Sequence, residues 1–263
     1  MGFIKRLKNQ PVIPGTVALY WLGQAGFLIK TADDRLLVVD PYYTDSVYHK
    51  FRKENGYSFK RLSAPLIDPE DLIYDDIYIS HEHEDHLDVE AFPQISRGGH
   101  TKVFCGQTCA KVLQSCDVSA EKIAVTQIGD TINRKGYSVR IIPANHSDLC
   151  PEAQGFLFDF GFTRIYYSGD TCYDEHIARS VKKYEPEICL LPINGAFGNM
   201  NVEEAFLFME KIHGRILIPH HFWTFPLHLG NPLELIEMAV QTQEGKKFRI
   251  QMLTPGEAFL IGN

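Results

Sequence analysis

Residues 77–88 run from an apolar strand directly into a cluster of histidines and carboxylates, Ile-Tyr-Ile-Ser-His-Glu-His-Glu-Asp-His-Leu-Asp. Side chains alternate along an extended backbone, so His81 and His83 project to the same side. A turn at Asp85 then brings Asp85 and His86 to a neighbouring point. Imidazole nitrogens and carboxylate oxygens are the usual ligands of zinc, and they also bind manganese and iron. The HxHxDH spacing therefore predicts a metal site rather than a solvated acidic turn.

This peptide alone cannot complete the coordination of two metal ions, so further ligands are expected at the ends of other strands. His146 follows the apolar run Ile141–Ala144, Asp170 follows Tyr166–Ser168, and the pair His220 and His221 follows Ile216–Pro219. Taken alone, His146 could be an ordinary loop residue and Asp170 could cap a turn. The repetition of the same pattern at four strand ends favours a shared metal site.

The order HxHxDH, His, Asp, His resembles the metallo-β-lactamase superfamily. Residues 12–30, Ser168-Gly-Asp-Thr and Ile218-Pro-His-His are similar to the L-ascorbate-6-phosphate lactonase branch. Residues 191–196 and 221–225 also resemble the phospholipase D that cleaves N-acylphosphatidylethanolamines. The resemblance extends from about residue 12 to the C-terminus. The chain is shorter than the lactonases, lacks their insertion after His146, and has no residue between the proline and the histidine pair, which makes His221 the better match to the family ligand.

The resemblance implies an α/β fold, a four-layer αβ/βα sandwich with two mixed β-sheets flanked by helices, in a single domain spanning residues 1–263. It also implies two divalent metal ions, zinc or manganese. One ion is bound by His81, His83 and His146, the second by Asp85, His86 and His221, and Asp170 bridges both. Two ions that share a hydroxide lower the pKa of water and polarise a carbonyl or phosphoryl oxygen.

Proton transfer is assigned to Asp85 as the catalytic residue. Asn194, in a turn after a strand, and His220 are candidate substrate-binding residues, with a turn role and outward packing as the respective alternatives. Asp88 is a candidate to orient a ligand histidine, and Asp40 is expected to serve a turn or to support the ligands from behind. Cys172 is expected to be a packed thiol rather than a nucleophile. The remaining histidines are assigned to surface or packing roles: His49, His100, His176, His213 and His228.

The expected activity is that of a metal-dependent hydrolase acting on a lactone of a sugar phosphate. The alternative is a phosphodiesterase or a phospholipase D-like hydrolase that uses the same site. A non-catalytic metal-binding regulatory protein is disfavoured because no ligand of the pattern is missing. A flavodiiron protein is disfavoured because it carries a carboxylate where this chain has His83.

Charge and composition limit the partners and the compartment. The chain has 26 Lys and Arg against 33 Asp and Glu, a formal net charge of −7, which argues against binding nucleic acid through a basic face. No apolar stretch approaches the ~18 residues of a membrane span, and no signal peptide or CxxC motif is evident. We therefore expect a cytoplasmic enzyme with a small, anionic substrate and no membrane partner. A homo-oligomer is compatible with the sequence.

Short β-type runs alternate with fewer helical segments along the chain. Helices are expected at Thr108–Ser115, after Asn201 with Glu204 completing a capping box, and at Pro232–Ala239. A hairpin is expected to turn at Gly161. The segment Tyr42–Pro69 shows no clear period and is either a surface crossover or the border of a substrate pocket. The nearest candidates for a phosphate clamp lie in this segment: Arg52, Lys53, Lys60 and Arg61.

Overall fold

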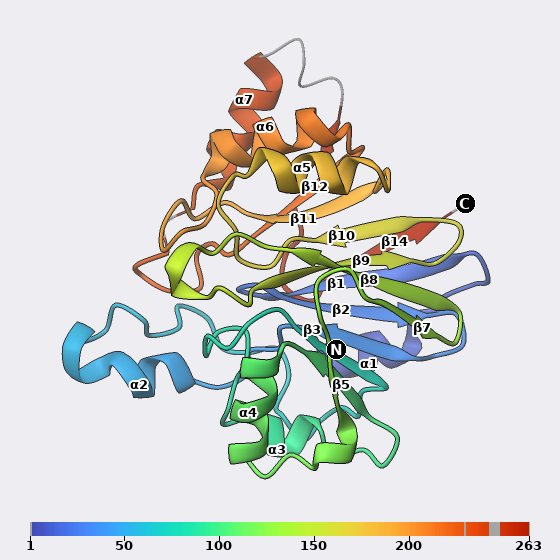
Figure 1. Ribbon diagram of the computed structural model, residues 1–263, viewed down its shortest axis with the longest axis vertical. Helices are drawn as coiled ribbons and strands as arrows, with labels where there is room; N and C mark the ends of the chain where they lie inside the picture. Colours follow the sequence, from blue (N-terminus) through green and yellow to red (C-terminus); the bar gives the residue numbers. More distant parts are fainter. Residues whose placement is uncertain (1, 229, 242–247, 263) are drawn as a thin grey trace. The chain divides into compact units, whose positions relative to one another are not determined.

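The computed structural model describes residues 2–228, 230–241 and 248–262, and these form two compact units (Figure 1). The first unit comprises Met1–Thr126, Thr224–Pro226 and Leu253–Asn263, and the second comprises Gln127–Trp223 and Leu227–Met252. Each unit contains one mixed sheet of seven strands with helices packed on it. The expectation of two mixed sheets with flanking helices is thereby confirmed.

The sheet of the first unit has the strand order β14-β1-β2-β3-β4-β5-β6. The strands β14, β1, β2 and β3 pair antiparallel, whereas β3 to β6 are parallel. The carboxyl ends of β3 and β4 consequently meet at one edge of the sheet, and the residues that follow them lie close together. Their bounds are β1 Thr16–Gly23, β2 Gly26–Thr31, β3 Leu36–Val39, β4 Asp76–Ile79, β5 Lys102–Cys105, β6 Ile123–Val125 and β14 Ala258–Gly262.

Four α-helices belong to the first unit: α1 Phe3–Asn9, α2 Ser46–Asn55, α3 Phe92–Ile95 and α4 Gln107–Ser115. The expected helix at Thr108–Ser115 is α4. Phe92 and Leu113 from α3 and α4 are buried with Ile77 of β4 in one apolar cluster. All four residues of β4 are buried, as is typical of a parallel strand covered on both faces. This packing fixes the end of β4, from which the histidine cluster emerges.

The segment Tyr42–Pro69 contains helix α2, which the sequence pattern did not reveal. Only Ser46 and Val47 of this helix are buried, so the spacing of its apolar residues does not indicate a helix. The helix is held instead by an aromatic cluster in which Phe51 and Phe59 pack against Tyr42, Val47 and Phe225. Phe225 is distant in sequence, so the stabilising contact exists only in the folded unit.

The sheet of the second unit has the order β13-β12-β11-β10-β9-β8-β7. Strands β7 to β10 pair antiparallel, and β10 to β13 are parallel, so β8, β10 and β12 end at the same edge. The hairpin between β9 and β10 turns at Gly161, whose φ is 82°, as expected. The bounds are β7 Thr131–Arg134, β8 Tyr137–Pro143, β9 Gln154–Asp159, β10 Arg164–Tyr167, β11 Ile188–Pro192, β12 Ile216–His220 and β13 Arg249–Ile250.

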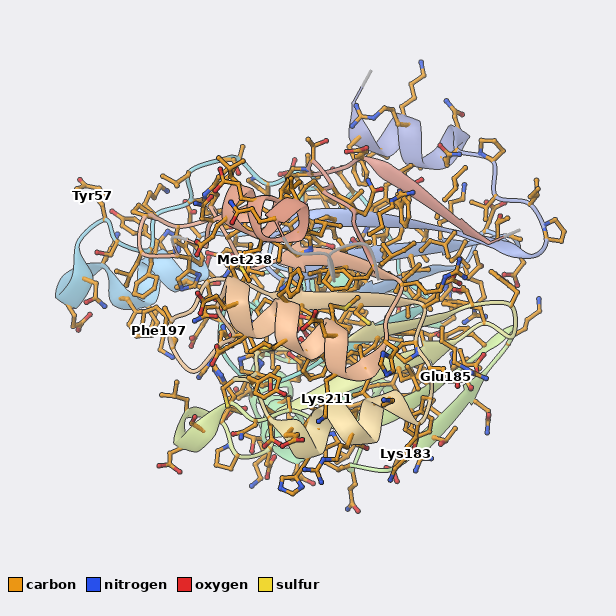
Figure 2. All side chains as sticks on the ribbon, turned by 90° about the horizontal axis from the view of Figure 1, so that it is seen from above. Tyr57, Lys183, Glu185, Phe197, Lys211 and Met238 are labelled. Carbon is orange, nitrogen blue, oxygen red and sulfur yellow. The ribbon has the colours of Figure 1, made fainter. Side chains whose placement is uncertain are left out.

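The helices of the second unit are α5 Glu175–Lys182, α6 Val202–Ile212 and α7 Pro232–Gln241. Figure 2 labels Lys211 on α6 and Met238 on α7. Nζ of Lys211 lies 2.6 Å from Oε1 of Glu175, and this ion pair connects α6 to α5. Both expected capping features are present: Asn201 and Glu204 form a capping box, and Asn231 accepts a hydrogen bond from Leu233 N at 3.1 Å. In the part of the chain that the structure describes, every helix is too short or too polar to cross a bilayer.

Replacing Asn201 by alanine should lower the free energy of unfolding by about 1 kcal/mol, because the backbone N–H of Glu204 loses its acceptor. Urea unfolding followed by circular dichroism measures the change. Asn201→Asp is the control, since aspartate also accepts at this position and should retain most of the stability. Equal losses in both variants would contradict a capping role.

Candidate metal centre

The histidine cluster of the first unit follows β4 and closes through a tight turn. The backbone N–H groups of His86 and Leu87 both donate to His83 O, at 2.9 and 2.7 Å. This turn brings Nε2 of His81 to 3.0 Å from Nδ1 of His83. Two nitrogens bound at 2.0–2.1 Å to one tetrahedral ion would be about 3.4 Å apart. The imidazoles predicted to share an ion therefore converge to nearly the required separation.

Asp40 and Ser80 orient the imidazoles from behind. Asp40 Oδ2 lies 2.6 Å from His86 Nδ1, and Asp40 Oδ1 accepts from Ser80 N at 2.7 Å. The Ser80 hydroxyl also contacts His81 Nδ1 at 2.9 Å. Asp40 and His86 are completely buried. Because a carboxylate accepts hydrogen bonds, it places the proton on Nδ1 of His86 and leaves Nε2 for a ligand.

Asp88 does not have the role expected of it. Its carboxylate accepts from Tyr43 N and Thr44 N, both at 2.8 Å, and from the Thr44 hydroxyl at 2.6 Å. Burial raises the pKa of Asp88, and these hydrogen bonds oppose the increase. Asp88 thus anchors the segment after β3, and the carboxylate that pairs with His86 is Asp40, for which the expected supporting role is confirmed.

Asp85 lies on the turn with its side chain partly exposed, and its Oδ2 is 3.7 Å from His86 Nε2. Gln24, between β1 and β2, donates from Nε2 to the same Oδ2 at 2.8 Å. Gln24 and Asp85 are separated by 61 residues, so no local sequence pattern indicates this contact. Asp85 therefore joins the histidines of its own unit as a ligand-type carboxylate.

The second unit assembles three ligand-type side chains from the ends of β8, β10 and β12. Asp170 Oδ2 lies 3.9 Å from His146 Nε2 and 3.2 Å from His221 Nε2. All three residues are buried. Both distances are to the same carboxylate oxygen, so Oδ2 of Asp170 lies near two imidazoles.

Residues around this second cluster include Asn199 and Phe197, which no sequence motif singles out. Asn199 Nδ2 donates to Asp170 Oδ2 at 2.8 Å. The buried His228 stacks on His221 with ring centroids 4.7 Å apart, and Phe197 packs on His228 at 5.4 Å. His228 thus has the packing role expected of it, although against a ligand-type histidine. No sequence signal distinguishes Asn199, since it lies in a loop of mixed composition.

Asn194 and His220, the candidate substrate-binding residues, are both buried. Asn194 Nδ2 donates to Ala196 O at 3.3 Å within its own turn. The ring of His220 stacks on Tyr167, with centroids 5.3 Å apart. Their substrate-binding role stays a prediction.

Cys172 is half-buried, and burial raises the pKa of its thiol, so it is poorly suited to act as a thiolate nucleophile. All six cysteines are free, as expected.

The basic residues of the segment Tyr42–Pro69 are largely engaged in structure. Lys60 pairs with Asp45. Arg61 donates to Tyr42 O at 3.1 Å and lies 4.6 Å above the ring of Tyr42, and burial lowers its pKa. Arg52 and Lys53 are exposed on α2. Of the four proposed clamp residues, these two retain the greatest freedom to meet an anion.

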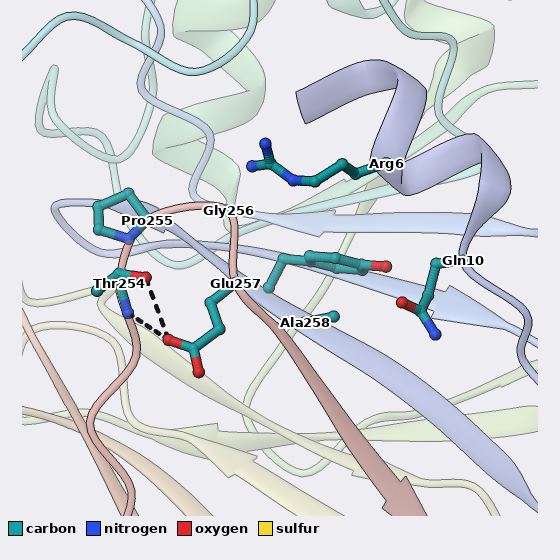
Figure 3. Close-up of a pocket in the computed structure, with 8 residues that line it drawn as sticks. Arg6, Gln10, Thr254, Pro255, Gly256, Glu257 and Ala258 are labelled. Carbon is teal, nitrogen blue, oxygen red and sulfur yellow. Dashed lines mark hydrogen bonds between the residues drawn. The ribbon is translucent and has the colours of Figure 1, made fainter. Parts of the chain in front are cut away.

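A pocket beside α1 lies in the first unit and is shown in Figure 3. Arg6 on α1 and Gln10 directly after it line one side, and residues 254–258, which lead into β14, line the other. Its carboxylate, Glu257, accepts from Thr254 N and from the Thr254 hydroxyl. The pocket contains no histidine, so its side chains are not a set that would bind a transition-metal ion.

Each cluster therefore offers imidazole and carboxylate groups in the proportion that suits a borderline divalent cation. In the first unit, ligand-type atoms of Asp40, His81 and His86 all lie within 4.8 Å of one another. This donor chemistry fits a metal centre, and it is poor in the amide and carboxylate oxygens that calcium requires.

The comparisons with known proteins agree with this geometry. A family described as the β-lactamase superfamily domain matches residues 18–221. A metal-dependent hydrolase of the UPF0173 family from Methanosarcina mazei is 30% identical over 253 residues, which cover 92% of this chain and 97% of the relative. The chain belongs to the metallo-β-lactamase superfamily. It is a metal-dependent hydrolase of the UPF0173 type.

Solved structures of other members confirm the metallo-β-lactamase fold. A possible metal-dependent hydrolase from Veillonella parvula has a TM-score of 0.74 at 15% identity and covers 93% of this chain and 99% of its own. The isothiocyanate hydrolase from Delia radicum gut bacteria has a TM-score of 0.73 at 19% identity, with coverage of 93% and 99%. The metallo-β-lactamase fold protein YhfI from Bacillus subtilis has a TM-score of 0.67 at 15% identity, with coverage of 94% and 100%.

Replacing Asp40 by asparagine should weaken zinc binding about 10- to 100-fold, because His86 loses its carboxylate partner. Asparagine tolerates the φ of 43° at this position, so the backbone need not change. Isothermal titration calorimetry of the metal-free protein with Zn²⁺ measures the effect. Asp159→Asn, in the β9–β10 hairpin, makes the same change of charge and should bind zinc normally. Unchanged affinity in Asp40→Asn would contradict an orienting role.

Proposed function

We propose that this hydrolase uses two divalent ions, zinc or manganese, and acts on a lactone of a sugar phosphate. The observation that carries the proposal is the position of Asp170 Oδ2 at 3.9 Å from His146 Nε2 and 3.2 Å from His221 Nε2. A buried carboxylate in contact with two imidazoles is well suited to binding two ions at once. Such a pair of ions would lower the pKa of a water molecule toward neutrality and polarise the scissile bond.

The ligand assignment follows the sequence resemblance. His81, His83 and His146 would bind one ion, Asp85, His86 and His221 the second, and Asp170 both. Within each unit, the distances between these side chains support the assignment.

Asp85 would accept the proton of the attacking water and deliver it to the leaving group. Its side chain is less deeply buried than those of His86 and Asp170, so a reactant can reach it. Gln24 donates to Asp85 and so restricts the rotation of the carboxylate. Proton transfer by a positioned carboxylate requires this fixed geometry.

The substrate assignment rests on the motifs shared with the ascorbate-phosphate lactonases. Phosphodiester hydrolysis is the second candidate, because residues 191–196 and 221–225 resemble the phospholipase D motifs. The related isothiocyanate hydrolase indicates that electrophilic carbon centres of other kinds belong in a substrate screen. Asn194 and His220 are proposed to contact the substrate. We further propose a cytoplasmic enzyme with a small anionic substrate and without nucleic-acid or membrane partners.

The wild-type protein, purified and dialysed against metal-free buffer, should retain close to two zinc or manganese ions per chain, measured by inductively coupled plasma mass spectrometry. Asp170→Ala should lose at least one ion, because the proposed shared carboxylate ligand is removed. It should hydrolyse the best substrate at least ~100-fold more slowly. Asp148→Ala, an exposed carboxylate two residues after His146, is the control. A fully active Asp170→Ala variant with two bound ions would refute the bridging role.

A panel of lactones, phosphodiesters and thioesters, each with and without a phosphate group, should identify the phosphorylated lactone as the best substrate. If α2 contacts the phosphate, Arg52→Ala and Lys53→Ala should raise KM for that substrate and leave KM for its unphosphorylated analogue unchanged. Lys5→Ala, on α1, serves as a charge-matched control. Equal KM values for the phosphorylated lactone in all three variants would exclude a clamp on α2.

A further inference from the structure

Two buried carboxamides each donate to one of the two ligand-type carboxylates. Gln24 Nε2 lies 2.8 Å from Asp85 Oδ2 in the first unit, and Asn199 Nδ2 lies 2.8 Å from Asp170 Oδ2 in the second. Gln24 is completely buried, and Asn199 is 6% exposed. Each pair lies within its own unit, so both units contain a hydrogen bond from a buried carboxamide to a ligand-type carboxylate.

Gln24 is held in a conformation that few residues other than glycine adopt. Its φ is 50°, in the turn that connects β1 to β2. The N–H of Gln24 donates to Thr224 Oγ1 at 3.0 Å, and its carbonyl accepts from Trp21 Nε1 at 2.9 Å. Strained backbone of this kind persists only where surrounding contacts hold it, and such strain gathers at functional sites. The turn therefore presents the Gln24 amide at a fixed position.

Asn199 is fixed by the loop between β11 and α6. Its N–H donates to Ala196 O at 3.1 Å, and the next residue, Met200, donates to Thr171 O at 2.8 Å. Thr171 follows Asp170 directly, so the loop is attached to the backbone beside the carboxylate that Asn199 contacts. These backbone hydrogen bonds thus hold the Asn199 side chain close to the Asp170 carboxylate.

In both pairs the amide meets the carboxylate oxygen that is near an imidazole. Asp85 Oδ2 is 3.7 Å from His86 Nε2, and Asp170 Oδ2 is 3.2 Å from His221 Nε2. An ionised carboxylate has two oxygens with about four lone-pair sites, so each aspartate can accept from an amide and still bind metal ions. An ionised carboxylate only accepts, which determines that the NH₂ group of each carboxamide faces it.

We propose that Gln24 and Asn199 are positioning residues that fix the metal-facing oxygens of Asp85 and Asp170. The inference rests on the proposed function, because it takes both aspartates as ligands. Each amide restricts rotation of its carboxylate and so holds the oxygen that it contacts in a fixed position. Their loss should weaken metal binding without removing a ligand.

The test uses the near-isosteric variants Gln24→Met and Asn199→Leu, which remove the donor and keep a side chain of similar size. Calorimetric titration of the metal-free full chain with Zn²⁺ should show binding about 10- to 100-fold weaker in each. The absorption spectrum of the Co²⁺-substituted protein should shift in its ligand-field bands, because the orientation of one carboxylate changes. A purely structural role would lower stability and leave that spectrum unchanged.

Double variants show whether each amide acts through its own carboxylate. Gln24→Met should weaken zinc binding in the wild type but have little further effect when Asp85 is already replaced by alanine. The same is expected of Asn199→Leu in an Asp170→Ala background. Additive losses in both cases would overturn the proposal. If either the methionine or the leucine variant fails to fold, Gln24→Leu and Asn199→Ala, which also lack the donor, take its place.

Thr101→Val is the control, since it removes a buried hydroxyl that donates to Tyr74 O at 2.6 Å and leaves both carboxamides and their contacts in place. It should lower stability while largely retaining zinc affinity and the cobalt spectrum. A wild-type protein that binds no metal would refute the proposed function itself. A wild type that binds metal, together with Gln24→Met and Asn199→Leu variants of equal affinity, would refute only the positioning role.

Discussion

The shared direction of the parallel strands is the constraint on which the ligand clusters depend. In the first unit, β3 and β4 run parallel, so Asp40 and the histidines that follow Ser80 emerge at the same edge. In the second unit, β8, β10 and β12 end at one edge and present His146, Asp170 and His221 there. Apolar packing holds these strands in place, so the sheets determine where the turns that carry the polar side chains begin.

Burying polar groups is costly, and in the first unit hydrogen bonds to the buried carboxylates offset part of this cost. Asp40 is satisfied by Ser80 and His86, and Asp88 by Tyr43 and Thr44. These contacts also determine which imidazole nitrogen carries the proton and in which direction each ring points. For Asp40, the contact with His86 that stabilises the buried carboxylate is thus the same contact that orients this histidine.

Much of the site was predictable because strand ends and ligand types are local properties of a sequence. His81, His83, Asp85 and His86 occur within six positions after an apolar run, and the structure brings them together. The capping box of α6 was equally readable, since its two members are three residues apart. Helix α2 was not, because its stability comes from Phe225, far away in the chain. The role expected of Asp88 was wrong for a related reason. Whether Asp40 or Asp88 contacts His86 depends on the fold and not on a local pattern.

The sequence by itself determined the chemistry of the site, namely which side chains could bind a metal ion and at which strand ends they stand. The tertiary structure alone decided which groups support them: Asp40 for His86, Gln24 for Asp85 and Asn199 for Asp170. The physical reason is distance along the chain. These partners are separated by 29 to 61 residues, so no local pattern records the pairing, and only the packing of strands and turns brings donor and acceptor within hydrogen-bond distance.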